Sequence, residues 1–188
     1  MGKLTFILGG ARSGKSSHAQ HLAQKLADGS GRDVTFIATA QALDDEMAAR
    51  IKKHREDRPA TWTTLEIPQG IPAYLQSHPA QTDMYLLDCI TLLANNVFMQ
   101  FIENDLVNEE QAKIALEKEI DELLTYIHAN DTEWILISNE VGLGLVPPYQ
   151  MGRVYRDLLG WANQRLAREA DEVLWMVAGI AVPISQFR

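Results

Sequence analysis

Cysteine is scarce in this chain, where Cys89 is the single example among 188 residues. An intramolecular disulfide and a cysteine-based zinc site are therefore excluded, and the composition suits a reducing cytoplasm. Long apolar runs are also missing, since none reaches the roughly 20 residues that a helix needs to cross a bilayer. The first residues lack the basic start and the small-residue cleavage site of a signal peptide. We therefore expect a cytoplasmic protein without membrane insertion.

Positive charge is limited as well: 17 Lys and Arg against 25 Asp and Glu give a formal net charge of −8. This charge argues against a nucleic-acid binder, because that class needs a basic face. An acidic protein can still bind a polyphosphate through local cations and backbone N–H groups, usually with a divalent metal. Internal repeats and interdomain linkers are not evident, so we expect a single domain over residues 1–188.

What the sequence does contain is an alternation of predicted strands and helices. Buried strands are expected at 3–8, 34–38, 84–88, 134–138 and 173–177, with a further candidate at 62–67. Helical patterns cover 16–27, 44–57, 91–101, 109–128 and 150–170. This alternation predicts an α/β fold with a mostly parallel sheet and helices on both faces.

The segment 9–16 matches the phosphate-binding pattern G-x-x-x-x-G-K-[ST] of the P-loop. Its residues are Gly9, Gly10, Ala11, Arg12, Ser13, Gly14, Lys15 and Ser16. The glycines let the backbone wrap around phosphate oxygens, and the helix that follows directs its free N–H groups at the anion. Lys15 is expected to reach the β- and γ-phosphates and Ser16 to bind Mg²⁺. With a strand before it and a helix after it, the motif predicts a nucleoside triphosphate site.

A second carboxylate for the metal is expected on a neighbouring strand. Asp88 ends an apolar strand, where such a group belongs, and a turn or capping aspartate is the alternative interpretation. Glu140 also follows a buried strand and is a second candidate for binding metal or positioning water. We therefore predict Ser16 and Asp88 as the Mg²⁺ ligands.

His54 lies in a basic stretch with Lys52, Lys53, Arg55 and Arg58. One interpretation is a partly buried or solvated histidine. The other is a nucleophile, because a neutral imidazole can attack phosphorus and form a phosphoramidate that splits one transfer into two. The arginines would keep the imidazole neutral by like-charge repulsion and would hold phosphate oxygens. The residues alone leave both interpretations open.

Seven segments in order resemble the bifunctional adenosylcobinamide kinase and adenosylcobinamide-phosphate guanylyltransferase family of cobalamin biosynthesis. They are GGARSGKS at 9–16, IAT at 37–39, DDEMAARI at 44–51, His54 with Arg58-Pro59 and Trp62, LLDCIT at 86–91, SNEVGLGLVP at 138–147 and RDLLGWANQ at 156–164. The resemblance covers nearly the whole chain.

The resemblance implies a RecA-like P-loop fold, a homotrimer and two reactions. In the first, ATP or GTP phosphorylates the aminopropanol hydroxyl of the corrinoid substrate adenosylcobinamide. In the second, a histidine takes GMP from GTP, releases pyrophosphate and passes GMP to the new phosphate, which gives adenosylcobinamide-GDP. By position the histidine is His54, and Lys15 is the other predicted catalytic residue.

The guanine-nucleotide contacts that the resemblance implies extend beyond the P-loop. They fall on Ala38, Thr39, Ala40, Arg55, Glu56, Asp57, Arg58, Glu66 and Asp88. The preferred phosphate donor, the corrinoid contacts and the sharing of one nucleotide site by both reactions are not indicated by any motif.

Other interpretations remain open at this point. Arg153 and Arg156 are either charge stabilisers in a transition state or partners in salt bridges. A small-molecule kinase with His54 idle is one alternative function, and a nucleotide-dependent switch protein without an acceptor substrate is another.

Overall fold

The computed structural model describes residues 2–28, 31–42, 44–56, 58–104 and 106–187. Within the helix that spans Asp45–Glu56, the side chains at 46, 47, 50, 53 and 54 are outside the description. No helix in these described ranges is long and apolar enough to cross a membrane.

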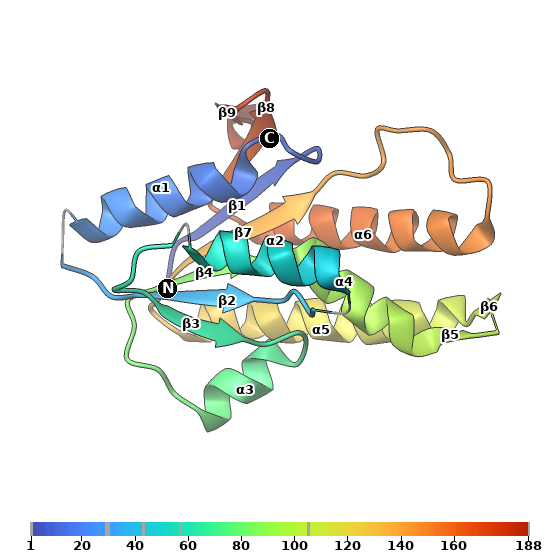
Figure 1. Cartoon of the computed structure of the whole chain (residues 1–188), viewed down its shortest axis with the longest axis horizontal. Helices are drawn as coiled ribbons and strands as arrows, with labels where there is room; N and C mark the ends of the chain where they lie inside the picture. The colour runs from blue at the N-terminus through green and yellow to red at the C-terminus, as the bar shows by residue number, and fades with distance from the viewer. Residues whose placement is uncertain (1, 29–30, 43, 57, 105, 188) are drawn as a thin grey trace.

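Seven strands form one sheet in the order β3-β2-β4-β7-β1-β8-β9 (Figure 1). Their bounds are β1 (Leu4–Gly9), β2 (Val34–Ala38), β3 (Thr63–Glu66), β4 (Met84–Asp88), β7 (Glu133–Asn139), β8 (Glu172–Val177) and β9 (Ile180–Pro183). Every neighbouring pair is parallel except β8 and β9, which form an antiparallel hairpin. The carboxyl ends of the parallel strands therefore meet at one edge of the sheet.

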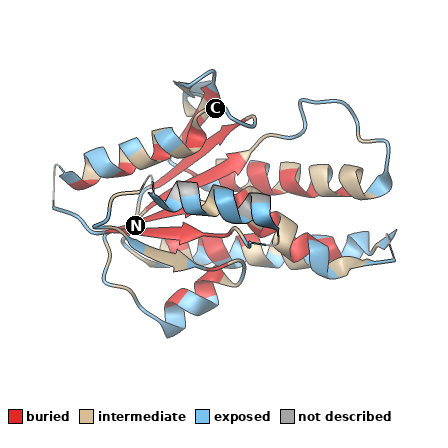
Figure 2. Cartoon of the chain, in the orientation of Figure 1, coloured by how far each residue is buried: buried red, intermediate tan, exposed pale blue. Residues whose placement is uncertain are grey.

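Helices lie on both faces of this sheet (Figure 1), and the strands between them are largely buried (Figure 2). They are α1 (Lys15–Asp28), α2 (Asp45–Glu56), α3 (Ile71–Ser77), α4 (Ile90–Phe98), α5 (Glu109–Ala129) and α6 (Gln150–Glu169). The side chains of β4 alternate between two cores, as the twofold period of a strand requires. Tyr85 and Leu87 pack with α3, α4, α5 and α6, whereas Met84 and Leu86 pack with α1. Burial on both faces explains why the inner strands are mostly apolar.

The predicted strands and helices are present, with most ends within two residues of their predicted positions. The predicted helix 91–101 becomes 3-10 helix η1 (Met99–Phe101) after α4, and position 57 of the predicted helix 44–57 lies outside the described residues. The patterns do not indicate helix α3, strand β9, the hairpin of β5 (Ile102–Glu103) and β6 (Leu106–Val107), or the terminal 3-10 helix η2 (Ser185–Phe187). Each of these elements has two to seven residues, too few for a periodic pattern to show.

Candidate active site

A cavity of about 640 Å³ lies at the carboxyl edge of the parallel strands. One wall is the turn between β1 and α1, and the other walls come from the ends of β2, β3, β4 and β7. The predicted site residues that line it are Ala11, Arg12, Ser13, Gly14, Lys15, Ser16, Ala38, Ala40, Arg58, Glu66 and Asp88. Five separate segments of the chain therefore converge on one space.

Lys15 lies over the P-loop at the start of α1 and is only 7% exposed. Its Nζ donates to the Gly10 carbonyl oxygen at 2.6 Å and lies 3.5 Å from the Ser13 Oγ. Burial lowers the pKa of Lys15, and the nearby Asp88 carboxylate acts in the opposite direction. The loop thus holds a poorly solvated ammonium group beside the N-terminal N–H groups of α1. This combination favours the binding of an anion.

The P-loop is supported by the turn of the C-terminal β8–β9 hairpin. The Gly179 N–H donates to the Ser13 carbonyl oxygen at 3.0 Å. Gly14 has a φ of 94°, and a Cβ there would lie 3.3 Å from the Gly179 Cα. Glycine is needed at position 14 for both reasons, the left-handed backbone and the close approach of the hairpin.

Opposite the P-loop, Arg58 and Phe36 form a stacked pair, with the guanidinium carbon 3.6 Å from the ring centroid. Burial lowers the pKa of Arg58, and the nearby Asp88 carboxylate acts against that shift. The Arg58 Nε is buried and has no hydrogen-bond partner within the described part of the chain. A partly desolvated guanidinium with donor capacity left over favours an anionic ligand in the cavity.

Cys89 follows Asp88 and also lines the cavity. Burial, together with the Asp88 charge, raises the pKa of the Cys89 thiol to about 12. The thiol is therefore neutral at physiological pH and is a poor nucleophile, because the thiolate is the reactive form.

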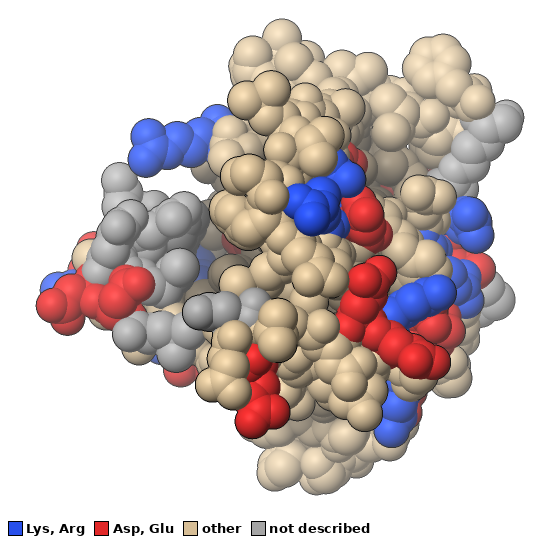
Figure 3. Space-filling view, turned by 90° about the vertical axis from the view of Figure 1, so that its right-hand side faces the viewer, with Lys and Arg blue, Asp and Glu red and all other residues tan. Residues whose placement is uncertain are grey.

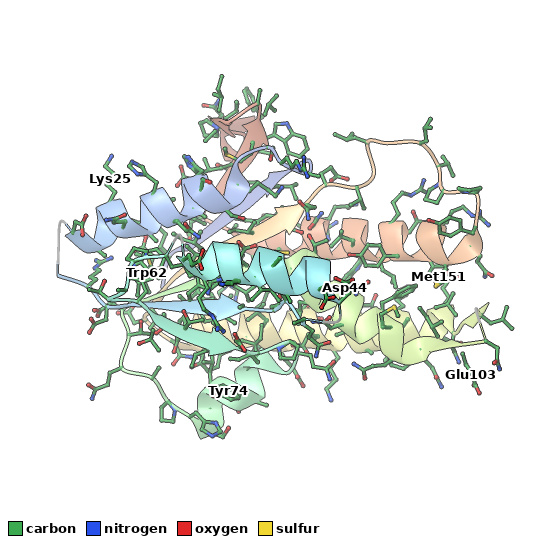
Figure 4. All side chains as sticks on the ribbon, viewed as in Figure 1. Lys25, Asp44, Trp62, Tyr74, Glu103 and Met151 are labelled. Atoms are coloured by element: carbon green, nitrogen blue, oxygen red, sulfur yellow. The ribbon has the colours of Figure 1, made fainter. Side chains whose placement is uncertain are left out.

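Helix α2 begins near the carboxyl edge of the sheet and runs back across it, with Asp44 at its start and Trp62 beyond its other end (Figure 4). Ile51 of this helix lines the cavity, and so does Arg58 two residues after the helix ends. His54 lies between them in sequence, one helical turn after Ile51, and its side chain is outside the described part of the structure. The backbone therefore brings position 54 to the region of the cavity.

The other predicted residues on this side have different surroundings. Arg55 forms an exposed ion pair with Glu66 that connects α2 to the end of β3. Glu56 is exposed, with Lys52 4.0 Å away, and is not among the described lining residues. Asp57 lies outside the described residues.

The three residues whose roles the sequence leaves open are not among the described lining residues of the cavity. The Glu140 carboxylate accepts from the N–H of Gly142 at 2.5 Å, in its own loop. Arg153 donates to the carbonyl oxygens of Pro147 and Pro148 at 3.0 and 2.9 Å, so it attaches the end of that loop to α6. Arg156 pairs with Asp157 at 2.9 Å.

Several lining residues are not among the predicted site residues, although Ile51, Cys89 and Asn139 lie in segments that carry the family resemblance. They are Ser17, Phe36, Ile51, Cys89, Leu92, Ile137 and Asn139. Most of them are apolar and belong to elements whose burial pattern resembles that of the core. Asn139 is different, because it is polar and directly precedes Glu140 at the end of a buried strand. That position at the carboxyl edge is the signal that could have identified it.

Thr39, Gly9 and Gly10 do not line the cavity but shape it. Thr39 is fully buried, and its Oγ1 donates to the Cys89 carbonyl oxygen and accepts from the Cys89 N–H, both at 2.8 Å. Asn96 of α4 donates from Nδ2 to the carbonyl oxygens of Thr39 at 2.8 Å and Pro68 at 2.9 Å. One carboxamide therefore joins the loops after β2 and β3, which directly follow the lining residues Ala38 and Glu66.

Changing Asn96 to aspartate is expected to weaken nucleotide binding about tenfold, since it replaces the bridging donor by an acceptor without changing its size. The measurement is the Kd of a nucleoside triphosphate by calorimetry. Asn95→Asp is the matched control, because Asn95 is the neighbouring asparagine of α4 and the described hydrogen bonds do not connect its side chain to either loop; its affinity should stay within about twofold of wild type. Equal affinities for Asn96→Asp and Asn95→Asp would contradict the bridging role.

Known proteins are similar in sequence to this chain over nearly its whole length. A family model described as cobinamide kinase / cobinamide phosphate guanyltransferase matches residues 5–184. The bifunctional adenosylcobalamin biosynthesis protein CobU of Salmonella typhimurium is 41% identical over 184 residues, which are 96% of this chain and 99% of that protein. CobU of Escherichia coli is 37% identical with the same coverage. CobP of Pseudomonas aeruginosa is 42% identical over 178 residues, 95% of each chain.

Solved structures resemble the fold at low sequence identity. One of them, an ATPase domain, has a TM-score of 0.54 and 14% identity, and it matches over 92% of this chain and 68% of its own. The flagellar accessory protein FlaH of Methanocaldococcus jannaschii has a TM-score of 0.51 and 16% identity, over 97% and 77%. These likenesses confirm the predicted α/β, RecA-like P-loop NTPase fold and carry no argument about substrates.

Proposed function

The chain belongs to the cobinamide kinase / cobinamide phosphate guanyltransferase family, and we propose that residues 1–188 form a single domain whose P-loop cavity serves both reactions. Its activity is that of a bifunctional enzyme of adenosylcobalamin biosynthesis, as in relatives at 37–42% identity over nearly their full length. The single observation that carries the shared site is the convergence of Lys15, Arg58 and Asp88 on one cavity beside α2.

In the kinase step, the adenosylcobinamide hydroxyl oxygen attacks the γ-phosphorus of ATP or GTP. The bond from that phosphorus to the bridging oxygen breaks, the nucleoside diphosphate leaves and the hydroxyl proton passes to solvent. Lys15 and the N–H groups at the start of α1 hold the phosphate oxygens and offset the charge that develops on them. The partial burial of these groups strengthens their effect, because water screens them less.

In the guanylyltransferase step, an imidazole nitrogen of His54 attacks the α-phosphorus of GTP with its lone pair. The bond to the β-phosphate oxygen breaks and pyrophosphate leaves. A phosphate oxygen of adenosylcobinamide phosphate then attacks the same phosphorus, the P–N bond breaks, and histidine and adenosylcobinamide-GDP result. Arg58 is proposed to hold the α-phosphate oxygens, and its position in the cavity lining close to Phe36 and Asp88 supports this role.

We also propose Mg²⁺ as the metal, held by Ser16 and Asp88, which both line the cavity. The described residues contain no group of three or more His, Cys, Asp or Glu side chains that could hold a metal. Two protein oxygens fit Mg²⁺ bound with a nucleotide, because phosphate oxygens and water complete its octahedral coordination. When bound, the ion would offset the charge on the phosphate oxygens.

A homotrimer is proposed on the basis of an exposed apolar loop between β7 and α6. Leu143 is 78% exposed, Leu145 97%, Val146 65% and Tyr149 64%. Figure 3 shows the side of the molecule on which this loop lies, and residues other than Lys, Arg, Asp and Glu cover much of that side. Exposed apolar surface of this kind favours association, and we propose a neighbouring subunit as its cover. A monomer mass by light scattering would contradict the proposal.

The remaining partners are small molecules: a nucleoside triphosphate and the corrinoid substrate. The acidic net charge of −8 supports the proposal that nucleic acid is not a partner, and we propose a cytoplasmic location.

The function is tested by supplying the two steps separately. With adenosylcobinamide, ATP and Mg²⁺, mass spectrometry of the product should show adenosylcobinamide phosphate. Addition of GTP should then convert it to adenosylcobinamide-GDP and release pyrophosphate. If adenosylcobinamide phosphate accumulates in the presence of GTP without conversion to adenosylcobinamide-GDP, the protein is a kinase alone. Steady release of inorganic phosphate without any corrinoid product would indicate a hydrolase and overturn the proposal.

A further inference from the structure

Asn139 occupies the central position at the carboxyl edge of the sheet. Its strand β7 lies between β1, which leads into the P-loop, and β4, which ends at Asp88. Asn139 is level with Gly9 in the register, and Ile137 is level with Asp88. Asn139 is the one carboxamide among the described lining residues of the cavity. It therefore lies between the phosphate-binding loop and the proposed metal-binding carboxylate.

The backbone of Asn139 is fixed on both sides of its side chain. Its N–H donates to the Thr91 Oγ1 at 2.7 Å, and its carbonyl oxygen accepts from the Asn163 Nδ2 at 3.0 Å. The next peptide N–H, of Glu140, donates to the Gly9 carbonyl oxygen at 3.0 Å. This segment is thereby attached to α4, α6 and β1 at once.

The residues that hold Asn139 are themselves held. The Tyr155 hydroxyl of α6 donates to the Thr91 carbonyl oxygen at 2.8 Å. Asn163 is only 4% exposed, and its Oδ1 has no hydrogen-bond partner in the described ranges. Its amide group is therefore held in a buried position beside β7, where the Nδ2 reaches the Asn139 carbonyl oxygen.

The Asn139 side chain, in contrast, is available to a ligand in the cavity. Among the described residues, the hydrogen bonds of Asn139 involve its backbone N–H and carbonyl oxygen, and none is donated by its carboxamide. A neutral N–H donor suits this place. A carboxylate would repel the triphosphate, and a lysine or arginine would pair with Asp88 instead. An amide can donate to a phosphate oxygen beside a metal-binding carboxylate without either conflict.

We propose that the Asn139 carboxamide donates a hydrogen bond to the terminal phosphate of the bound nucleoside triphosphate, with Thr91 and Asn163 as positioning residues. This inference rests on the proposed function, because it assumes that the cavity holds a triphosphate. In the kinase step the donor lies where charge develops on the transferred phosphoryl group, so its contribution increases toward the transition state.

The direct test compares a diphosphate with a non-hydrolysable triphosphate by calorimetry on wild type and Asn139→Ala. We expect the variant to bind the triphosphate about tenfold more weakly and the diphosphate within about twofold of wild type. A structural role would weaken both alike, and that outcome would overturn the proposal, as would unchanged affinity for both. This test needs no corrinoid, so its result is independent of whether wild type phosphorylates adenosylcobinamide.

Kinase kinetics supply a second measurement. Asn139→Ala should lower kcat about 100-fold and raise the KM for ATP about tenfold, in agreement with its weaker triphosphate binding. Thr91→Val, which keeps the shape and removes the hydroxyl that accepts from Asn139, should lower kcat about tenfold, and Thr91→Ser should restore most of it. If Thr91→Val and Thr91→Ser have equal kcat values, the positioning role of that hydroxyl is wrong.

Discussion

Replacement of His54 by alanine is expected to abolish the acid-labile label that GTP labelled on its α-phosphate leaves on the denatured protein. The phosphoramidate forms on an imidazole nitrogen, and alanine offers no nucleophile in its place. Adenosylcobinamide-GDP formation should fall by at least about 1,000-fold, whereas kinase activity should stay within about threefold of wild type. The two activities separate because the γ-phosphorus reacts at the P-loop and the α-phosphorus at helix α2.

The backbone supports this assignment to position 54. Ile51 precedes it by one turn and lines the cavity, and Arg58 follows it by four residues and lines the cavity too. His21→Ala is a matched control, since His21 is an exposed histidine of α1 and should keep full labelling. Label that persists in His54→Ala would show that another residue is the nucleophile. A parallel loss of kinase activity would show that the substitution disturbs the whole cavity.

The parts of the site that are contiguous in sequence could be predicted without the structure. The conformation of residues 9–16 is determined locally, because a glycine-rich turn between a strand and a helix presents its backbone N–H groups to an anion in any fold. Asp88 could be placed because the end of a buried parallel strand always lies at the carboxyl edge of its sheet. The order of the strands in the sheet cannot be derived from these local patterns. The sequence therefore does not show that Asp88, Asn139 and Lys15 lie around one cavity, and the folded chain does.

Other features depend on contacts between distant segments, for which a single sequence gives no sign. The stacking of Arg58 on Phe36 joins a loop after α2 to the middle of β2. The support that Gly179 gives Ser13 joins the C-terminal hairpin to the P-loop across most of the chain. Strand β9 escapes prediction for a similar reason: it is a short edge strand with mostly exposed side chains, so no burial pattern identifies it. Tertiary packing rather than local propensity determines all three.

Changing Lys15 to methionine is expected to reduce the kinase rate by about 100- to 1,000-fold, the loss typical of removing a transition-state charge stabiliser. Labelling of His54 from GTP should also fall, because both reactions are proposed to use the same phosphate-binding loop. Methionine keeps the unbranched stem that is buried against the loop and removes only the ammonium group. The rates are measured from product formation at saturating nucleotide, with KM determined for each variant.

The Lys15→Met variant should lose activity without losing stability, and this difference is the more specific test of the role of Lys15. Burial lowers the pKa of Lys15, which means that the folded state disfavours the charged form relative to the unfolded chain. At neutral pH, far below the ordinary pKa of a lysine, the charged ammonium therefore opposes folding, and methionine removes that opposition. The free energy of unfolding, measured in urea, should be equal to or higher than that of wild type. Lys15→Arg is the comparison, since it keeps the charge but places a larger group at a residue that is only 7% exposed. Its kinase rate should stay well below that of wild type. A Lys15→Met protein that is both inactive and less stable would show that the lysine maintains the loop, through its bond to Gly10, rather than acting on the phosphates.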